Sequence, residues 1–185
     1  FIADTVYAQN NNLLGTIEAS FKVTTRGAMT LKNILIEDTV NGDGLYLRHL
    51  SATPIVLQNV ISRGNEKIGL RIGTYGNVSL TSVKSTGNGT DGARITNWGP
   101  DGIGTITITS PASAGTAGAN DFSDNDGYGL FLASNKNITL TNLDASGNGA
   151  DGLWVDTPGN LTINKTLPNW ANGFNRNGEN GILSG

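Results

Sequence analysis

Short stretches in which apolar and polar residues alternate recur along the chain. In the segment NITLTNLDASGNGADGLWV, which starts at Asn137, residues Ile138 to Thr141 alternate with the period of two that is typical of a β-strand. Asn142 interrupts this alternation, a second short stretch resumes it, and a turn rich in Gly and Asn leads to a third apolar stretch at Gly152. The pattern predicts three short strands per copy, and the intervals between them are too short for a helix.

The copies align on the glycine that opens the third strand, at a spacing of about 23 residues. An asparagine precedes five of these glycines by four residues, and only the first copy, with Val40 at that place, departs. Such self-similarity predicts stacked units, none of which can bury its apolar face alone. The glycines are Gly44, Gly69, Gly92, Gly129, Gly152 and Gly181, and the asparagines are Asn65, Asn88, Asn125, Asn148 and Asn177.

This aligned repeat resembles that of right-handed parallel β-helix proteins, the family that includes pectate lyase-like proteins and many surface adhesins. The resemblance covers roughly residues 28–185 and implies an all-β, single-stranded right-handed parallel β-helix, a solenoid of about seven coils. Residues 1–27 are expected to form an N-terminal segment and a first irregular coil, with Phe1–Asn12 a candidate strand for docking on a neighbour.

Three columns of aliphatic residues are expected to point inward and to replace a conventional globular core. Stacking is needed because each buried aliphatic side chain contributes only about 1.5–3 kcal/mol against the entropy cost of ordering a coil. The first column is Met29, Ile55, Val78, Ile106, Ile138 and Leu161; the second is Leu31, Leu57, Leu80, Ile108, Leu140 and Ile163; the third is Leu45, Leu70, Ala93, Leu130, Leu153 and Ile182.

The composition limits the functional classes. A net charge of -3 and a pI near 5.0 give no basic footprint, which argues against a nucleic-acid partner. The absence of cysteine excludes disulfides and thiol chemistry, and no apolar run is long enough to predict a membrane span. The first residues lack the charged start of a signal peptide, as in a processed chain or an excised fragment. Together with the family resemblance, the composition favours an extracellular or cell-surface location.

The repeated asparagines admit a ligand-binding and a structural interpretation. Amides stacked at one turn can bond to one another and cap the turn backbone, so we expect the five to form a structural asparagine ladder. Asn33, Asn59 and Asn142, with Ser82 at the same place, predict a second ladder.

Asp-Gly recurs at Asp43, Asp91 and Asp151, with Asn180 at the equivalent place. Stacked carboxylates could hold calcium, but Ile68 and Tyr128 interrupt the column, and Asp before Gly is a common turn choice. We therefore expect turn residues here and predict no metal site and no cofactor.

The most suggestive surface feature lies two residues after each repeated glycine. These positions point outward if the intervening residues point inward, and aromatic and arginine side chains are enriched where protein surfaces contact partners. We interpret this outward column as a candidate binding surface for a glycan or a protein. The alternative is that the irregular segments 97–104 and 110–120 cover it. The candidate binding residues are Tyr46, Arg71, Arg94, Phe131 and Trp154, and Leu183 completes the column.

The chain carries none of the catalytic motifs that the resemblance would imply for an enzyme. In the pectate lyases and polygalacturonases that the repeat resembles, catalysis needs clustered acidic residues with an arginine, lysine or histidine. Here the sole histidine, His49, has no acidic neighbour in sequence, and we interpret it as a turn residue. General acid–base chemistry needs a coupled pair in a cleft, and no such pair is evident, so an enzyme is not favoured.

The two ends of a β-helix expose strand edges and apolar core, and solenoids need caps there. The last copy, from Gly159, stops at Gly185 inside a strand without a cap. We therefore expect either a fragment of a longer β-helix or an end-to-end fibre of identical copies. The leading hypothesis is an extracellular structural or adhesive subunit that assembles with itself. The alternatives are a carbohydrate-binding module and a non-catalytic fragment of a polysaccharide-active enzyme.

Overall fold

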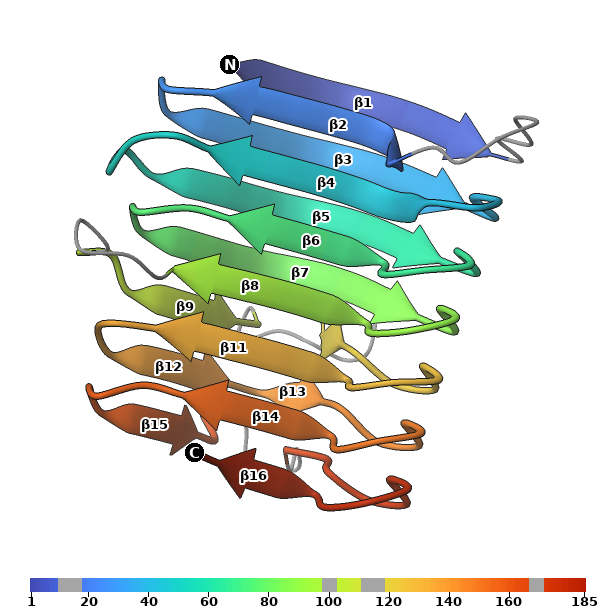
Figure 1. The fold of residues 1–185 in the computed structure, drawn as a ribbon, viewed down its shortest axis with the longest axis vertical. Coiled ribbons are helices and arrows are strands. Elements are labelled where there is room, and N and C mark those ends of the chain that lie inside the picture. The colour runs from blue at the N-terminus through green and yellow to red at the C-terminus, as the bar shows by residue number, and fades with distance from the viewer. Residues whose placement is uncertain (10–17, 98–102, 111–118, 167–171) are drawn as a thin grey trace.

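The computed structural model describes the chain except for residues 10–17, 98–102, 111–118 and 167–171, and Figure 1 shows its stacked levels. The described residues form two β-sheets, and the chain passes from one sheet to the other as it winds from the N-terminal to the C-terminal end. Every strand pair in this described part is parallel, and each strand pairs with its equivalents in the preceding and following levels. The predicted all-β parallel solenoid is confirmed.

Sheet A contains the three longest strands of the described chain, of nine residues each. Its order is β1 (Ile2–Gln9), β3 (Met29–Glu37), β5 (Ile55–Arg63), β7 (Val78–Thr86), β9 (Ile106–Thr109), β12 (Ile138–Thr141) and β15 (Leu161–Asn164), with the short strands β10 (Asn120–Asp121) and β13 (Leu143–Asp144) beside this path.

Sheet B contains the strands that follow the repeated glycines. Its order is β2 (Ala19–Thr25), β4 (Asp43–His49), β6 (Leu70–Gly73), β8 (Ala93–Asn97), β11 (Leu130–Ser134), β14 (Leu153–Asp156) and β16 (Ile182–Ser184).

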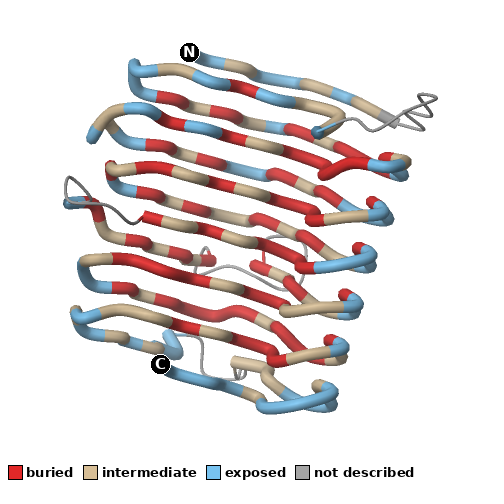
Figure 2. The backbone as a smooth tube through the Cα atoms, in the orientation of Figure 1, coloured by how far each residue is buried: buried red, intermediate tan, exposed pale blue. Residues whose placement is uncertain are grey.

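The core lies inside the solenoid, where buried and partly exposed residues alternate along the strands (Figure 2). The pairing register places the predicted inward residues directly over one another, as when Ile55 pairs with Met29 on one side and Val78 on the other. The first five members of all three predicted columns are at most 1% exposed. Their equivalents in the last level are less covered, and Ile182 is 43% exposed. Stacking therefore buries each level through its two neighbours.

The prediction of three separate strands per coil is wrong for the N-terminal half of the solenoid. There, β3, β5 and β7 each run through both of the expected first and second strands as nine residues. The residue at the middle of each bends it with a left-handed backbone, at a φ of 53° in Asn33, 54° in Asn59 and 55° in Ser82. A single such residue redirects the strand while the pairing resumes on both sides of it. The interruption seen at Asn142 in the sequence, also at positive φ, divides β12 from β13.

The number of coils is slightly lower than predicted. Over the described residues the solenoid makes about six turns instead of about seven. The reason is geometric, because the seven strands described for sheet B are joined by only six steps from one level to the next.

The N-terminal segment continues both sheets. β1 pairs with β3 and β2 pairs with β4, each in parallel register. The use of Phe1–Asn12 for docking stays a prediction, and residues 10–12 lie outside the described residues. Within the described chain, no helix has the length and apolar character needed to cross a membrane.

Candidate functional site

The repeated asparagines lie at the turn that leads into sheet B. Asn65 donates from Nδ2 to Oδ1 of Asn88 over 2.8 Å, and the same bond links the later members at 2.9, 3.0 and 3.2 Å. Each of these acceptor oxygens also receives a backbone N–H from the preceding member, as from Asn88 to Asn125 at 3.0 Å. The first four members are at most 2% exposed. Their amides are therefore committed to holding successive turns together.

The repeated glycines make room for this ladder. A Cβ atom placed on Gly129 would lie 2.6 Å from Nδ2 of Asn148, and one on Gly92 would lie 2.6 Å from Nδ2 of Asn125. Such distances are far shorter than a normal contact, so the amide of the next level occupies the space of the missing side chain. The pairing of asparagine with glycine in the repeat thus has one steric cause.

The second predicted ladder is discontinuous in the described contacts. Asn59 donates from Nδ2 to Oδ1 of Asn33 at 2.7 Å, and Asn33 donates to Oδ1 of Asp4 at the same distance. Asn142 instead donates to the hydroxyl of Thr166 at 2.7 Å. Because Asn33 and Asn59 are exposed, these bonds compete with water.

The candidate binding residues form one column on the outer face of sheet B. The register pairs Tyr46 with Arg71, Arg71 with Arg94, Arg94 with Phe131 and Phe131 with Trp154. All five side chains are partly buried. The sequence pattern thus brings together, on neighbouring strands, residues that span more than half of the chain.

The aromatic rings of this column stack along the solenoid. The rings of Phe131 and Trp154 lie 4.2 Å apart, centroid to centroid, with an interplanar angle of 10°. On the other neighbouring strand, the guanidinium carbon of Arg94 lies 4.3 Å from the centroid of Phe131. Both faces of Phe131 are therefore covered by the protein, which leaves no free face on which a sugar could stack. A looser stack surrounds Tyr46, with Lys22 at 5.5 Å and Arg71 at 5.6 Å from the ring centroid.

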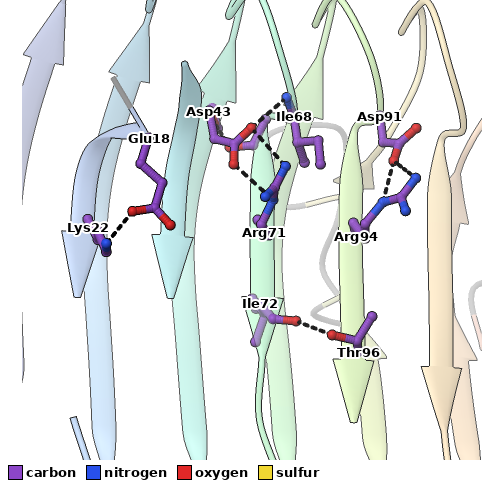
Figure 3. A network of polar contacts seen from close by, with 11 residues as sticks. Glu18, Lys22, Asp43, Ile68, Arg71, Ile72, Asp91, Arg94 and Thr96 are labelled. Carbon is purple, nitrogen blue, oxygen red and sulfur yellow. Dashed lines mark hydrogen bonds and ion pairs between the residues drawn. The ribbon is translucent and has the colours of Figure 1, made fainter. Parts of the chain in front are cut away.

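Each arginine of the column pairs with an aspartate of the Asp-Gly turns (Figure 3). Nε of Arg71 lies 2.9 Å from Oδ2 of Asp43, which belongs to the preceding level. Arg94 donates from Nε to Oδ2 of Asp91, in its own level, at 2.8 Å, and its Nη2 lies 2.7 Å from the same oxygen. Burial raises the pKa of Asp43 above its ordinary value, and the nearby Arg71 and the N–H of Ile68 only partly offset this. The carboxylates thus hold the two guanidinium groups in fixed directions.

An open cavity of about 430 Å³ lies between the two arginine side chains. Its lining mixes cationic, hydroxyl-bearing and small residues, with an aromatic ring at one side. These are Tyr46, Lys67, Ile68, Arg71, Gly73, Thr90, Asp91, Arg94 and Thr96. The arrangement can receive a polar, flexible ligand from solvent.

The Asp-Gly turns have a clear backbone function. Oδ1 accepts the backbone N–H of the next level in each case, from Ile68 to Asp43 at 3.1 Å, from Tyr128 to Asp91 at 3.1 Å and from Asn180 to Asp151 at 2.8 Å. Among the described residues, no group of three or more acidic, histidine or cysteine side chains is placed to hold a metal ion. Residues 98–102 and 111–118 of the two irregular segments that could cover the outward column lie outside the described residues.

The sequence suggested that His49 is a turn residue, and this is wrong. His49 is the last residue of strand β4 and is only 2% exposed. Its Nε2 atom lies 2.8 Å from the carbonyl oxygen of Gly27 and 2.9 Å from Oγ1 of Thr53, and Nδ1 lies 3.4 Å from Oγ1 of Thr74. The imidazole therefore ties neighbouring turns together, and these contacts include no carboxylate that could orient it as a base.

Sequence reasoning missed Lys67 and the pairing of aspartate with arginine. The Asp91–Arg94 pair could have been found from its spacing of three residues. The Asp43–Arg71 pair joins different levels, so it becomes visible only once the copies are aligned in space.

Comparison with known protein families gives one match over nearly the whole chain. The family model described as a right-handed β-helix region matches residues 3–184. No curated protein and no solved structure matches the chain.

Proposed function

Because the chain belongs to the right-handed β-helix family, we propose that it is a non-catalytic, extracellular adhesive protein that binds a polysaccharide through the outer face of sheet B. The observation that carries this proposal is the open cavity that Tyr46, Arg71 and Arg94 line on that face. Small and hydroxyl-bearing residues complete the lining, which suits a ligand with many hydroxyl groups.

The chemistry of the site supports binding rather than turnover. The two arginines are paired with aspartates, and His49 makes its contacts with a carbonyl and two threonines. Binding sites fix a polar ligand with a few well-placed donors, and an arginine fork held in place by a carboxylate meets that requirement. The extracellular location is part of the proposal, and the low content of charged residues, at 15%, supports it.

Binding of the full chain to a panel of immobilised polysaccharides tests this function. We expect at least one glycan to bind, and we expect Arg94→Ala and Tyr46→Ala to weaken it about tenfold or more, as for central contact residues. Thr139→Ala, on the outer face of sheet A, is the matched control and should bind as the wild type does. If no polysaccharide binds, or if the control loses as much affinity as the two variants, the proposal is wrong.

A second function, end-to-end self-assembly, is favoured by a separate observation at the C-terminal level. The ladder ends there at Asn177, whose buried Nδ2 has no hydrogen-bond partner in the described structure. Beside it, Ile182 and Leu183 of the edge strand β16 are 43% and 39% exposed. An unpaired edge with apolar side chains is a template for a further strand.

The occupant that we propose for this edge is the N-terminal level of a second copy. The edge strands of that level are β1 and β2, and its Phe1 and Ile2 are 53% and 79% exposed. Since all described pairs are parallel, a copy added in this way continues both sheets in the same direction. A head-to-tail contact of this kind does not close and produces a filament.

Light scattering and electron microscopy of the full chain, over a wide range of protein concentration, test the assembly. We expect filaments that lengthen with concentration and that Leu183→Lys prevents, because it places a charge on the shared edge. Thr139→Lys adds the same charge to the outer face of sheet A and should leave assembly intact. A wild-type chain that stays monomeric at every protein concentration would contradict self-assembly. It would not bear on the first proposed function, polysaccharide binding.

A further inference from the structure

Two arginines lie side by side on the outer face of sheet B, although their charges repel. Arg71 and Arg94 are directly paired in the register of β6 with β8. Like charges at directly opposite positions destabilise a sheet. The structure separates them, because Arg71 turns to Asp43 of the preceding level and Arg94 turns to Asp91 of its own level (Figure 3). Both arginines line the cavity.

This cavity is positively charged in a protein that is negatively charged overall. Its lining carries three cationic side chains, Lys67, Arg71 and Arg94, against two carboxylates, Asp91 in the lining and Asp43 paired with Arg71. The chain as a whole has a net charge of -3. Lys67 makes no ion pair among the described contacts, and its charge acts on the Asp43 carboxylate only from a longer distance. Cations gathered in a hollow surface concentrate the field on an incoming anion.

The two guanidinium groups keep donors for a ligand. A guanidinium has five N–H donors, and Asp91 occupies donors on two of the three nitrogens of Arg94. Arg71 likewise contacts Asp43 through Nε and Nη2. Because planar guanidinium forks match the two oxygens of a carboxylate or a sulfate ester, the remaining N–H groups suit such an anion.

We infer that the cavity between Arg71 and Arg94 binds an acidic group, a carboxylate or a sulfate ester, of the polysaccharide ligand. This inference rests on the proposed function and names the class of its ligand. A glycan fits better than a protein partner, because protein contacts are usually anchored by bulky side chains in closed pockets. Here the cavity is open, and Gly73, Thr90 and Thr96 contribute small or hydroxyl-bearing surface.

Three forms of one polymer test the inference with the full chain: dextran, carboxymethyl-dextran and dextran sulfate. Because their backbone is the same, differences in affinity report the acidic group and its identity. We expect binding to one or both acidic forms and not to dextran, with an affinity that falls as salt concentration rises. Lys67→Gln, Arg71→Gln and Arg94→Gln should each weaken that binding about tenfold, the effect of losing a charged hydrogen bond.

The variants separate a specific site from general charge attraction. Arg26→Gln removes the same charge from an exposed side chain outside the cavity lining and should leave affinity unchanged. Lys67→Gln removes no described ion pair, so its effect does not depend on a destabilised fold, and thermal unfolding of all variants checks this. Equal loss in Arg26→Gln, or no loss in Lys67→Gln and Arg94→Gln, overturns the inference.

Failure of the inference is distinguishable from failure of the proposed function. If neutral glycans of the panel bind as tightly as the acidic polymers and still depend on Tyr46 and Arg94, the function holds and the acidic class is wrong. If acidic peptides bind in place of every polysaccharide, or if nothing binds, both are wrong.

Discussion

At the scale of single residues, the asparagine ladder makes a sharp prediction for Asn125. Its Oδ1 accepts both the backbone N–H and the side-chain amide of Asn88. Asn125→Ala leaves these two buried donors unpaired, and each such group costs about 1–3 kcal/mol. We therefore expect urea unfolding to show a loss of about 2–6 kcal/mol, well above that of a single solvated bond.

The matched control for this prediction is Asn59→Gly, because glycine adopts the left-handed φ of 54° at this position without strain. Asn59 also donates to a stacked asparagine, but it is exposed, and water can replace its partner. Its loss should stay near or below about 1 kcal/mol. Equal losses at the two positions would mean that burial does not govern the strength of the ladder.

Asp43 gives a second residue-scale prediction, on pH. Burial raises its pKa in the folded state above the ordinary value of 3.8. The folded state therefore binds this proton more tightly than the unfolded state does. The resulting contribution to stability is complete below the unfolded pKa and is lost as pH rises through the folded pKa.

Asp43→Asn tests this sign, because asparagine keeps an acceptor for the N–H of Ile68 and does not titrate. Subtracting the unfolding free energy of the variant from that of the wild type, in urea at successive pH values, isolates the carboxyl group. We expect this difference to decrease as pH rises above 3.8. A difference that increases with pH would show that Arg71 outweighs burial and would reverse the assignment.

At the scale of elements, we expect the repeated glycine that opens the strands of sheet B to matter as much for the stability of the fold as the apolar columns do. Gly129→Ala places a methyl group 2.6 Å from Nδ2 of Asn148, and 2.6 and 2.7 Å from the carbonyl oxygens of Gly152 and Phe122. Backbone on two sides cannot yield easily, so we expect a loss of about 1–3 kcal/mol, typical of overpacking. Gly73→Ala is the control for space, since the nearest atom to its Cβ, Oγ1 of Thr96, would lie at an ordinary 3.9 Å and its φ is not left-handed. If Gly129→Ala unfolded at the same temperature as the wild type, this steric explanation of the repeated glycine would be wrong.

The same elements show how far the sequence could predict this fold. Alternation and the aligned glycines predict the inward columns and the parallel pairing, because every level repeats the same strand positions even where the spacing between levels changes. They do not reveal that Asn33, Asn59 and Ser82 bend single long strands, since an interrupted pattern looks alike for a bend and a turn. The outward column followed from alternation, whereas the cavity beside Lys67 did not. That cavity depends on which way Arg71 and Arg94 turn, and this is decided by which levels carry an aspartate, since Ile68 stands in the level of Arg71 where Asp91 stands in the level of Arg94.

At the scale of the whole molecule, stacking predicts a gradient of stability along the solenoid. A central strand such as β8 is paired on both sides and its core residues Ala93 and Ile95 are fully buried. The last strand of sheet B, β16, is paired on one side and leaves Ile182 and Leu183 exposed. Local opening is easiest where few buried contacts must be broken. In dilute solution we therefore expect amide hydrogen exchange to be fastest in β16 and slowest around β8.

Hydrogen exchange also links this gradient to assembly. If a second copy covers the C-terminal edge, the amides of β16 gain partners and should become protected as protein concentration rises, while those of β8 stay as they were. Leu183→Lys should keep β16 fast at every concentration, because the edge stays uncovered. Protection of β16 that equals that of β8 in the dilute chain would contradict the gradient itself. Protection that never changes with concentration would leave the gradient intact and count against the filament, because an edge that gains a neighbour cannot keep exchanging at the rate of a free one.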